Sequence, residues 1–444
     1  MKYAKTRWWA AGLAGTLALS MAGCSAGGGT ATPAQEAPTA FEGEPVTIQY
    51  WGSKPQLEPV VELFNEQQDT ITVEFTEQAG DMELATALRN AHAAGNAPCV
   101  FDTQTEQLTS FVSDEIASDV TEVATPYQAD YSEHAWNAVT LGEQTFGLPA
   151  ASIPAFMLFN SRVFEEAGLE YPTTWEEFIE AGKVLNENGS KIYNLAPEDY
   201  TTFVYLAWQA GAQWWQLEGD SWKVDVDSEA TSRAADTIQQ MIDNEIVESI
   251  SYAEYAAMMQ EYNDGAIASR QLSTWQTAGM QNNLTSGLGE WEAAPNPTFE
   301  GEDPANVSFT RVYGIETQCE DPEAAAFFAN WMATDEEAVA LLANQIEGAG
   351  WFPAVADPAP FIDETEPTKL LGDHTDSWEP TVQNAVETQK GDWTYGPNTA
   401  AAFEVLADQW GKAVAGEIKV ADIAPFMQDW IVKDLEQSGI SVTE

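Results

Sequence analysis

Apolar and polar positions near the start of the chain follow a pattern that predicts strands separated by helices. Residues 46–51 and 71–77 are apolar and β-branched runs of the kind found in strands. Residues 57–67 place apolar side chains at helical spacing, and residues 81–94 predict a second helix with an aspartate as its cap and a glycine after its end. Residues 99–102 predict a third, buried strand. This order is typical of a parallel sheet with helices on its faces.

Helix-capping patterns predict that helices dominate the second half of the chain. Thr173 and Glu176 have the spacing of a capping box in front of an apolar helix, and Thr334 and Glu337 repeat that spacing. We therefore expect helices to begin at both places.

Two stretches rich in proline and glycine predict irregular crossings rather than regular elements. They are residues 146–154 and 295–306, and a strand-like pattern resumes over residues 307–315. The chain has 444 residues, more than one ordinary hydrophobic core accommodates. Two domains or two lobes are therefore expected.

The N-terminal segment has the order of an export signal. Lys2, Lys5 and Arg7 form a positive stretch, residues 8–19 are apolar, and small residues then lead to Cys24. A transmembrane anchor is the alternative, but the apolar run is shorter than the ~20 residues that span a bilayer.

The residues that end at Cys24 resemble the lipobox of bacterial lipoproteins, with Met21 where leucine is commonest. This resemblance implies that residues 1–23 are a signal peptide and that the Cys24 thiol becomes lipidated. The chain would then be held at the cell membrane by lipid, on its extracellular or periplasmic face. Residues 24–44 are small, polar and rich in proline, which predicts a flexible tether.

The composition is strongly acidic, with 71 Asp and Glu against 17 Lys and Arg and a formal net charge of −54. Such a surface repels nucleic acid and anionic lipid headgroups, so neither is expected as a partner. The acidic residues are spread along the whole chain, which indicates a solvated surface and does not identify a ligand.

Apart from Cys24, the chain contains two cysteines, Cys99 and Cys319. An even pair in an exported protein is consistent with a disulfide, because the compartment is oxidising. Two separate buried thiols are the alternative, and the sequence leaves both open.

The sequence contains no HExxH, GxSxG, Walker A or CxxC pattern. The acidic stretch 225–229 is better explained as a polar helix start than as a metal site. We therefore expect no catalytic residue, no metal and no cofactor, and we do not expect an enzyme. A secreted glycoside hydrolase acting on oligosaccharides is the alternative, because so many acidic residues could supply the pair of carboxylates that its chemistry needs.

Several separated segments, taken together and in order, resemble the bacterial extracellular solute-binding proteins (family 1) of carbohydrate ABC transporters, the group that includes maltose-binding protein. They are residues 84–101, 146–185, 261–280, 320–332 and 402–431.

This resemblance implies an α/β, two-lobed fold of the periplasmic-binding-protein type II class. Each lobe would be a mixed, mostly parallel sheet flanked by helices, and hinge crossings would join the lobes. Residues 45–148 plus 307–365 would form lobe 1, and residues 149–306 plus 366–444 would form lobe 2. It further implies a monomer that captures a sugar or oligosaccharide by lobe closure and delivers it to the transmembrane permease subunits of an ABC importer.

A neutral sugar has apolar faces and a ring of hydroxyls, so its site needs flat aromatic side chains and a few fixed polar groups. The resemblance places Lys54 where the family has a ligand-contacting lysine and Trp275 where it has a stacking tryptophan. Other candidates follow strand ends or lie in loops and helix starts, where α/β folds bind ligands. The full set of candidates is Trp51, Lys54, Gln104, Tyr200, Trp275, Trp351, Asp392 and Trp393. For each tryptophan, simple packing is the competing interpretation.

A binder of the same fold for a polyol or another small solute, such as a phosphate ester, is a further alternative. A phosphate would favour clustered arginines. The arginines beyond the signal segment are widely spaced along the sequence: Arg89, Arg162, Arg233, Arg270 and Arg311. We therefore expect a neutral mono- or oligosaccharide.

Overall fold

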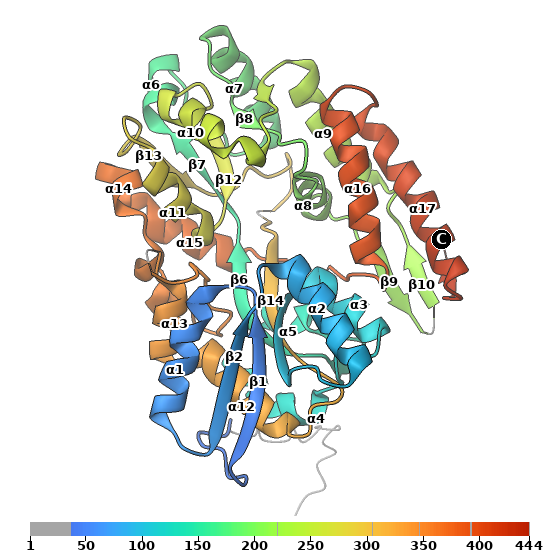
Figure 1. Cartoon of the computed structure of the whole chain (residues 1–444). Coiled ribbons are helices and arrows are strands. Elements are labelled where there is room, and N and C mark those ends of the chain that lie inside the picture. Colours follow the sequence, from blue (N-terminus) through green and yellow to red (C-terminus); the bar gives the residue numbers. More distant parts are fainter. Residues whose placement is uncertain (1–36, 220, 304, 346, 391–392, 444) are drawn as a thin grey trace, which may run out of the picture. The chain divides into compact units, whose positions relative to one another are not determined.

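The computed structural model of the chain describes residues 37–219, 221–303, 305–345, 347–390 and 393–443 (Figure 1). These residues belong to one compact unit. The predicted signal peptide, Cys24 and most of the predicted tether lie outside the described residues.

Strands from distant parts of the sequence form the sheet of lobe 1: β2 (Ile71–Glu77), β1 (Val46–Gly52), β3 (Val100–Gln104), β14 (Ser308–Ile315) and β6 (Leu148–Pro154), in that order across the sheet. β1 is parallel to β2 and β3, as the sequence pattern predicts. β14 runs antiparallel to both β3 and β6. The helices of this lobe are α1 (Glu58–Gln67), α2 (Asp81–Ala94), α3 (Thr105–Ser113), α4 (Thr121–Ala124), α5 (Glu133–Ala138), α12 (Pro322–Thr334) and α13 (Glu336–Ala343), and a small hairpin joins β4 (Thr140–Leu141) to β5 (Gln144–Thr145).

Lobe 2 is built around a sheet in which β7 (Phe156–Asn160) lies between β12 (Ser269–Leu272) and β13 (Trp291–Ala294). Both neighbours run antiparallel to β7, so this sheet differs from the mostly parallel one expected. The main helices of lobe 2 are α6 (Ser161–Ala167), α7 (Trp175–Glu187), α8 (Thr201–Gln209), α9 (Glu229–Asp243), α10 (Tyr255–Asp264), α11 (Thr274–Asn283), α14 (Thr368–Leu371), α15 (Trp378–Glu387), α16 (Thr399–Val414) and α17 (Ile423–Gln437).

Smaller elements complete the described chain. The short strands are β8 (Tyr193–Asn194), β9 (Trp215–Glu218), β10 (Ser221–Val224), β11 (Val247–Glu248) and β15 (Val442–Thr443). The 3-10 turns are η1 (Pro55–Leu57), η2 (Thr125–Asp130), η3 (Tyr252–Glu254), η4 (Ala359–Phe361), η5 (Asp363–Thr365), η6 (Gly372–Ser377) and η7 (Val420–Asp422).

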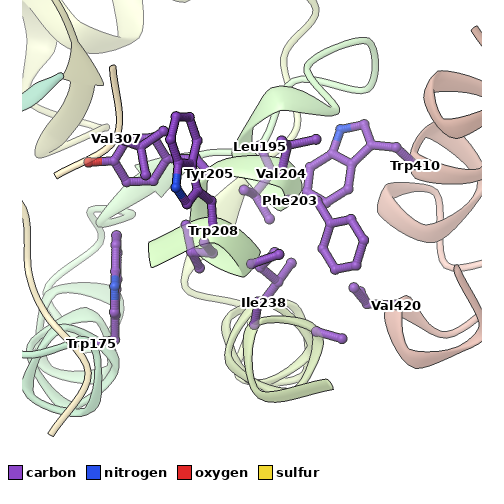
Figure 2. Packing of buried hydrophobic residues seen from close by; sticks show 14 of the residues in the cluster. Trp175, Leu195, Phe203, Val204, Tyr205, Trp208, Ile238, Val307, Trp410 and Val420 are labelled. Atoms are coloured by element: carbon purple, nitrogen blue, oxygen red, sulfur yellow. The ribbon is translucent and has the colours of Figure 1, made fainter. Parts of the chain in front are cut away.

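Aromatic side chains form much of both cores. In lobe 1, the Tyr50 ring packs against Tyr313 and Phe328 at centroid distances of 5.9 and 5.5 Å. In lobe 2, α8 is buried along residues 202–209, which marks a central helix surrounded by other elements. Figure 2 shows Trp410 and Val420 on one side of this helix and Trp175 on the other. Separate clusters of buried residues in the two lobes agree with a two-lobed protein.

The first predicted capping box is wrong by one residue. Helix α7 begins at Trp175, and Thr174 is the extended residue in front of it. The Glu177 carboxylate accepts hydrogen bonds from Thr173 and Thr174, so the box pairs Thr174 with Glu177.

The second predicted capping box is also wrong. Asp335 caps α13, because its carboxylate accepts hydrogen bonds from the Glu337 and Ala338 backbone amides. The Thr334 hydroxyl instead donates to the Asn330 carbonyl of the preceding helix.

The two predicted crossings meet at one carbonyl group. Most of the first crossing is the regular strand β6, and Ala155 alone separates it from β7 in the other sheet. The side-chain amides of Asn296 and Asn306, in the second crossing, both donate to the Ala155 carbonyl oxygen, at 2.7 and 2.5 Å. The Tyr205 hydroxyl donates to the Asn306 side chain at 2.6 Å. These hydrogen bonds join both crossings to α8.

The lobe boundaries proposed from the sequence stay predictions. Trp351 packs with the core of lobe 1, whereas the next residue, Phe352, packs with Phe156 and Trp378 in lobe 2. The chain between Trp351 and α14 therefore contacts both lobes.

Cys99 and Cys319 are joined by a disulfide that links the start of β3 to the residues before α12. Closing a loop of 220 residues restricts the unfolded chain.

We expect the double change Cys99→Ser and Cys319→Ser to lower the free energy of unfolding by about 2–4 kcal/mol, measured by urea denaturation. A reductant should destabilise the unchanged protein and leave the double variant unaffected. Two reactive thiols in the unreduced, unfolded protein would contradict the disulfide.

Candidate functional site

A cavity of about 570 Å³ is lined by residues of both lobes. Lobe 1 contributes side chains from the ends of its central strands, namely Lys54 after β1 and Gln104 at the end of β3. Lobe 2 contributes Tyr193 of β8 and the residues from Arg270 to Ser273, along β12 and just after it. The strand ends of an α/β sheet are the usual location of a ligand site, and this volume suits a small ligand.

An ion cluster around Arg311 of β14 forms the lobe 1 side of the cavity. The Arg311 guanidinium is 2.9 Å from Asp81 Oδ1 and 3.1 Å from Asp102 Oδ2. It also donates to the Ser53 hydroxyl at 3.0 Å. Arg311 is 4% exposed and the Asp102 side chain is fully buried. The single positive charge of Arg311 is thus shared by two carboxyl groups.

The same cluster shifts the ionisation of its two carboxyl groups in opposite directions. Burial raises the pKa of Asp81, but the hydrogen bond and charge of Arg311 outweigh it and hold that pKa well below its usual range. Burial raises the pKa of Asp102, against the opposing Arg311 charge. Asp81 is therefore a carboxylate in the cavity. It does not cap α2, since Gly80 holds that position, and its Oδ2 instead accepts a hydrogen bond from Gln104 at 2.8 Å.

Two tryptophans with different exposure face the cavity. Trp275, in the first turn of α11, is 47% exposed, and Lys54 Nζ lies 5.9 Å from its ring centroid. Trp351 is 4% exposed and lies under the Arg311 guanidinium at 4.7 Å. Gly350 brings them together: it has φ of +66°, and a Cβ atom there would meet Trp275 Cα at 2.8 Å. The Thr274 hydroxyl donates to the Gly350 carbonyl, which joins α11 to this loop.

The lobe 2 side of the cavity combines tyrosines with one acid and one arginine. The Tyr252 hydroxyl donates to Asp199 Oδ2 at 2.7 Å, and the Thr201 hydroxyl donates to Asp199 Oδ1. Arg270 is 6% exposed, with its guanidinium 5.7 Å from the ring of Tyr262. The cavity thus offers aromatic surface, hydroxyl groups, and donors and acceptors with charge.

The structure brings four of the predicted site residues to this cavity: Lys54, Gln104, Trp275 and Trp351. Their contact with a ligand stays a prediction.

Three other candidates are not among the described residues that line the cavity. Trp51 is partly buried on β1. The Tyr200 ring packs on Phe403 at 5.3 Å. Trp393 is 7% exposed and packs between Trp208 and Trp214. Asp392 lies outside the described residues.

The fold also brings to the cavity several residues that are not among the candidates predicted from the sequence. Asp81, Asp199, Arg270 and Arg311 come from four segments that only the folded chain places together. The wide spacing of the arginines along the sequence therefore gave no evidence against a cluster of cations in the folded chain. A usable signal existed for Arg311, because it is a lone charge within the strand-like run 307–315.

Glu106 of α3 provides a test of the electrostatics near the cavity. Burial raises its pKa to about 7, the Asp81 charge adds to this, and Arg311 opposes it. The folded protein therefore keeps a proton on Glu106 between about pH 4.5 and 7 that the unfolded chain releases. Stability should fall as the pH rises through this window, by about 1–3 kcal/mol, and level off above it.

The measurement is urea unfolding at several pH values for the unchanged protein and for Glu106→Gln. The variant should lack this part of the fall. The exposed Glu83→Gln should keep it, as the matched control. Parallel pH profiles for all three proteins would rule out the shifted pKa of Glu106.

Two kinds of feature are absent from the described residues. Within them, no helix combines the length and apolar character needed to cross a bilayer. Within the same ranges, no group of three or more His, Cys, Asp or Glu side chains could hold a metal ion. Glu229 begins α9, with Ser228 as its cap, and Asp225 forms an ion pair with Lys223.

Comparison with solved structures identifies the fold. A galacto-N-biose/lacto-N-biose I-binding protein of an ABC transporter from Bifidobacterium longum, solved with lacto-N-biose, is 24% identical. The likeness covers 91% of this chain and 100% of that one, with a TM-score of 0.78. An ABC-transporter-associated binding protein from B. animalis subsp. lactis, solved with β-1,6-galactobiose, is 19% identical over 90% of this chain and 99% of its own, with a TM-score of 0.74. The two-lobed fold expected from the sequence is thereby confirmed.

Sequence comparison gives a shorter match to a curated relative and a longer match to a family. The arabinooligosaccharide-binding protein of Halalkalibacterium halodurans is 23% identical over 176 residues, which are 38% of this chain. The match spans only 39% of that relative's length. The model of the family described as bacterial extracellular solute-binding protein matches residues 51–339, more than half of the chain. The chain therefore belongs to the bacterial extracellular solute-binding proteins.

Proposed function

We propose that this protein binds a sugar or oligosaccharide outside the cell and delivers it to the permease of an ABC importer. It has no catalytic role in this proposal. The ligand enters the cavity between the lobes, and closure of the lobes then surrounds it with groups from both sides.

The observation that carries the proposal is the mixture of surfaces in the cavity. Trp275 offers an exposed aromatic face from lobe 2, and such faces suit the apolar C–H side of a sugar ring. Lys54 and Gln104 from lobe 1 and Tyr252 from lobe 2 offer polar groups to its hydroxyls. A saccharide needs both kinds of surface, so it matches this lining better than a purely apolar or purely ionic solute does.

The comparisons support the same ligand class by analogy. Both solved relatives described above hold a disaccharide, and the curated relative is named for an oligosaccharide. The permease partner belongs to the proposal because both solved relatives are described as binding proteins of ABC transporters.

The cavity offers little to the alternative of a glycoside hydrolase. Such an enzyme needs one carboxyl group that stays protonated to act as an acid. Asp102 and Glu106 have raised pKa values, but they are not among the described residues that line the cavity. Asp81 is ill suited, because Arg311 holds its pKa well below the usual range. Both oxygens of Asp199 accept hydrogen bonds from neighbouring hydroxyls.

A thermal-shift screen followed by calorimetry tests the proposal. The mature chain is mixed with mono- and oligosaccharides, polyols and phosphate esters, and the mixtures are then analysed for products. A saccharide should raise the melting temperature and remain intact, because a ligand that binds only the folded state stabilises it. Cleavage of the saccharide would favour the hydrolase. Stabilisation by a polyol or phosphate ester alone would favour another solute.

Lipid anchoring is proposed through Cys24. The unchanged protein, produced in a bacterium fed labelled palmitate, should carry the label and sediment with membranes. Cys24→Ser should carry no label, while the neighbouring Ser25→Ala should behave like the unchanged protein. Equal labelling of all three would place the lipid elsewhere, and no labelling of any would remove the anchor.

A further inference from the structure

We infer that the bound saccharide carries an acidic group, a carboxylate of the hexuronic acid type, and that Arg270 is the residue that receives it. This inference rests on the proposed function and names the ligand class more closely. It replaces the expectation of a neutral ligand, which depended on the spacing of arginines along the sequence.

The arginines in the described part of the chain differ in whether they form an ion pair. Arg89, Arg162, Arg233 and Arg311 each form an ion pair with an aspartate or glutamate. The Arg270 side chain forms no ion pair there, and its Nη1 atom has no hydrogen-bond partner. With 71 acidic residues against 17 basic ones, a partner is easily supplied in this chain. The lack of an acidic partner for Arg270 in the described chain therefore calls for an explanation.

The Arg270 side chain is also buried. Arg270 is 6% exposed, and its Nη1 atom is buried without a hydrogen-bond partner in the described structure. A guanidinium has five N–H donors and cannot be deprotonated in a protein, so it cannot relieve burial by losing its charge. A charge removed from water without a partner is strongly unfavourable. Because Arg270 lines the cavity, a ligand can supply the missing acceptor.

The acidic residue near Arg270 on the lobe 2 side of the cavity does not neutralise it fully. Asp199 is the acid on this side of the cavity, and it acts on Tyr252 in the opposite direction to Arg270. Its two oxygens are directed to the hydroxyls of Tyr252 and Thr201 instead of to the guanidinium. Asp199 therefore offsets part of the field of Arg270 but leaves the N–H groups available.

A second cation strengthens the case. Lys54 lines the same cavity and forms no ion pair within the described residues. Arg311 also has a buried nitrogen without a hydrogen-bond partner, its Nε, but its charge is already paired with Asp81 and Asp102. Lys54 and Arg270 are both donors without acceptor capacity, one on each side of the cavity.

The chemistry of these groups selects the ligand. An arginine fork binds a carboxylate through two parallel hydrogen bonds. The aromatic face of Trp275 and the polar groups around it suit a sugar ring. A sugar ring with a carboxylate in place of its hydroxymethyl group satisfies both requirements.

The experiment compares matched ligands by isothermal titration calorimetry on the mature chain. The probes are galacturonate against galactose, glucuronate against glucose, and digalacturonate against galactobiose. The protein variants are Arg270→Gln, Arg270→Lys and the control Arg233→Gln, at a partly exposed arginine outside the lining of the cavity.

We expect the acidic member of at least one pair to bind about 30-fold or more tightly than the neutral member, with an affinity that falls as salt rises. Arg270→Gln should weaken binding of the acidic sugar much more than binding of the neutral sugar and so remove this preference, and Arg270→Lys should restore it in part. Arg233→Gln should leave the preference unchanged. The melting temperature of ligand-free Arg270→Gln should not fall, because the change removes a buried unpaired charge.

Other outcomes separate this inference from the proposed function. Tighter or equal binding of the neutral sugars would overturn the acidic ligand and leave saccharide capture standing. A preference for acidic sugars that survives Arg270→Gln would overturn the role of Arg270. Failure of every saccharide to bind would count against both.

Discussion

Replacing Arg311 with methionine is expected to lower the free energy of unfolding by about 3–5 kcal/mol. The change removes the positive charge that Asp102 and Asp81 share, while the Asp102 side chain stays fully buried. A buried carboxyl group left without its partner must either stay charged at high cost or take up a proton. The measurement is urea denaturation near neutral pH, where that cost is largest.

The matched control is Arg233→Met, which breaks an ion pair on the protein surface with Glu302. It should cost less than about 1 kcal/mol, because exposed ion pairs contribute little. Adding Asp102→Asn to Arg311→Met should recover part of the loss, since the carboxylate no longer needs a partner. Equal, small losses for the two arginine variants would show that the cluster does not hold the lobe 1 side of the cavity together.

Replacing Trp275 with alanine is expected to weaken saccharide binding by about 10- to 100-fold, as loss of an aromatic anchor does at many binding sites. Its ring is 47% exposed in the cavity and lies beside Lys54, so it offers a free face to a ligand. The same exposure means that its removal should change the free energy of unfolding by less than about 1 kcal/mol. Calorimetric titration with the saccharide found in the screen measures the first effect, and urea denaturation measures the second.

The matched control is Trp222→Ala on β10, a partly buried tryptophan outside the lining of the cavity. The affinity of the Trp222→Ala variant for the saccharide should equal that of the unchanged protein. If Trp275→Ala binds as tightly as the control, Trp275 does not stack on the ligand.

The elements in the first half of lobe 1 could be predicted well, because each depends on residues that are neighbours in the sequence. The runs that became β1 and β2 alternate buried apolar residues with more exposed ones, and β3 is a short buried run; both patterns are typical of strands. Gly95 ends α2 in the left-handed conformation, as a glycine after a helix predicts. Such features depend only on neighbouring residues.

Features that depend on competition between neighbouring side chains were predicted less well. Thr173 and Thr174 could both cap α7, and the sequence does not say which of them lies in extended backbone. The first turn of α2 gives a clearer case: Asp81 looked like a cap, but the tertiary structure provides a stronger partner in Arg311, 230 residues away.

The candidate site shows the same division. Lys54 follows β1 and Gln104 is the last residue of β3, so their place near a cavity could be predicted from topology. Arg270 and Asp199 could not, because their importance comes from what lies near each of them in the folded chain. Trp393 resembled a loop aromatic in the sequence, and only the fold reveals its packing against Trp208 and Trp214.

Small-angle X-ray scattering of the mature chain with and without the saccharides of the screen tests most directly whether this protein is a two-lobed trap for a glycan. The account predicts that at least one saccharide reduces the radius of gyration in a saturable way, with a midpoint that matches its calorimetric affinity. It predicts no such change for Trp275→Ala at the same ligand concentration near that midpoint. Identical profiles with every saccharide bound or absent would contradict capture by lobe closure.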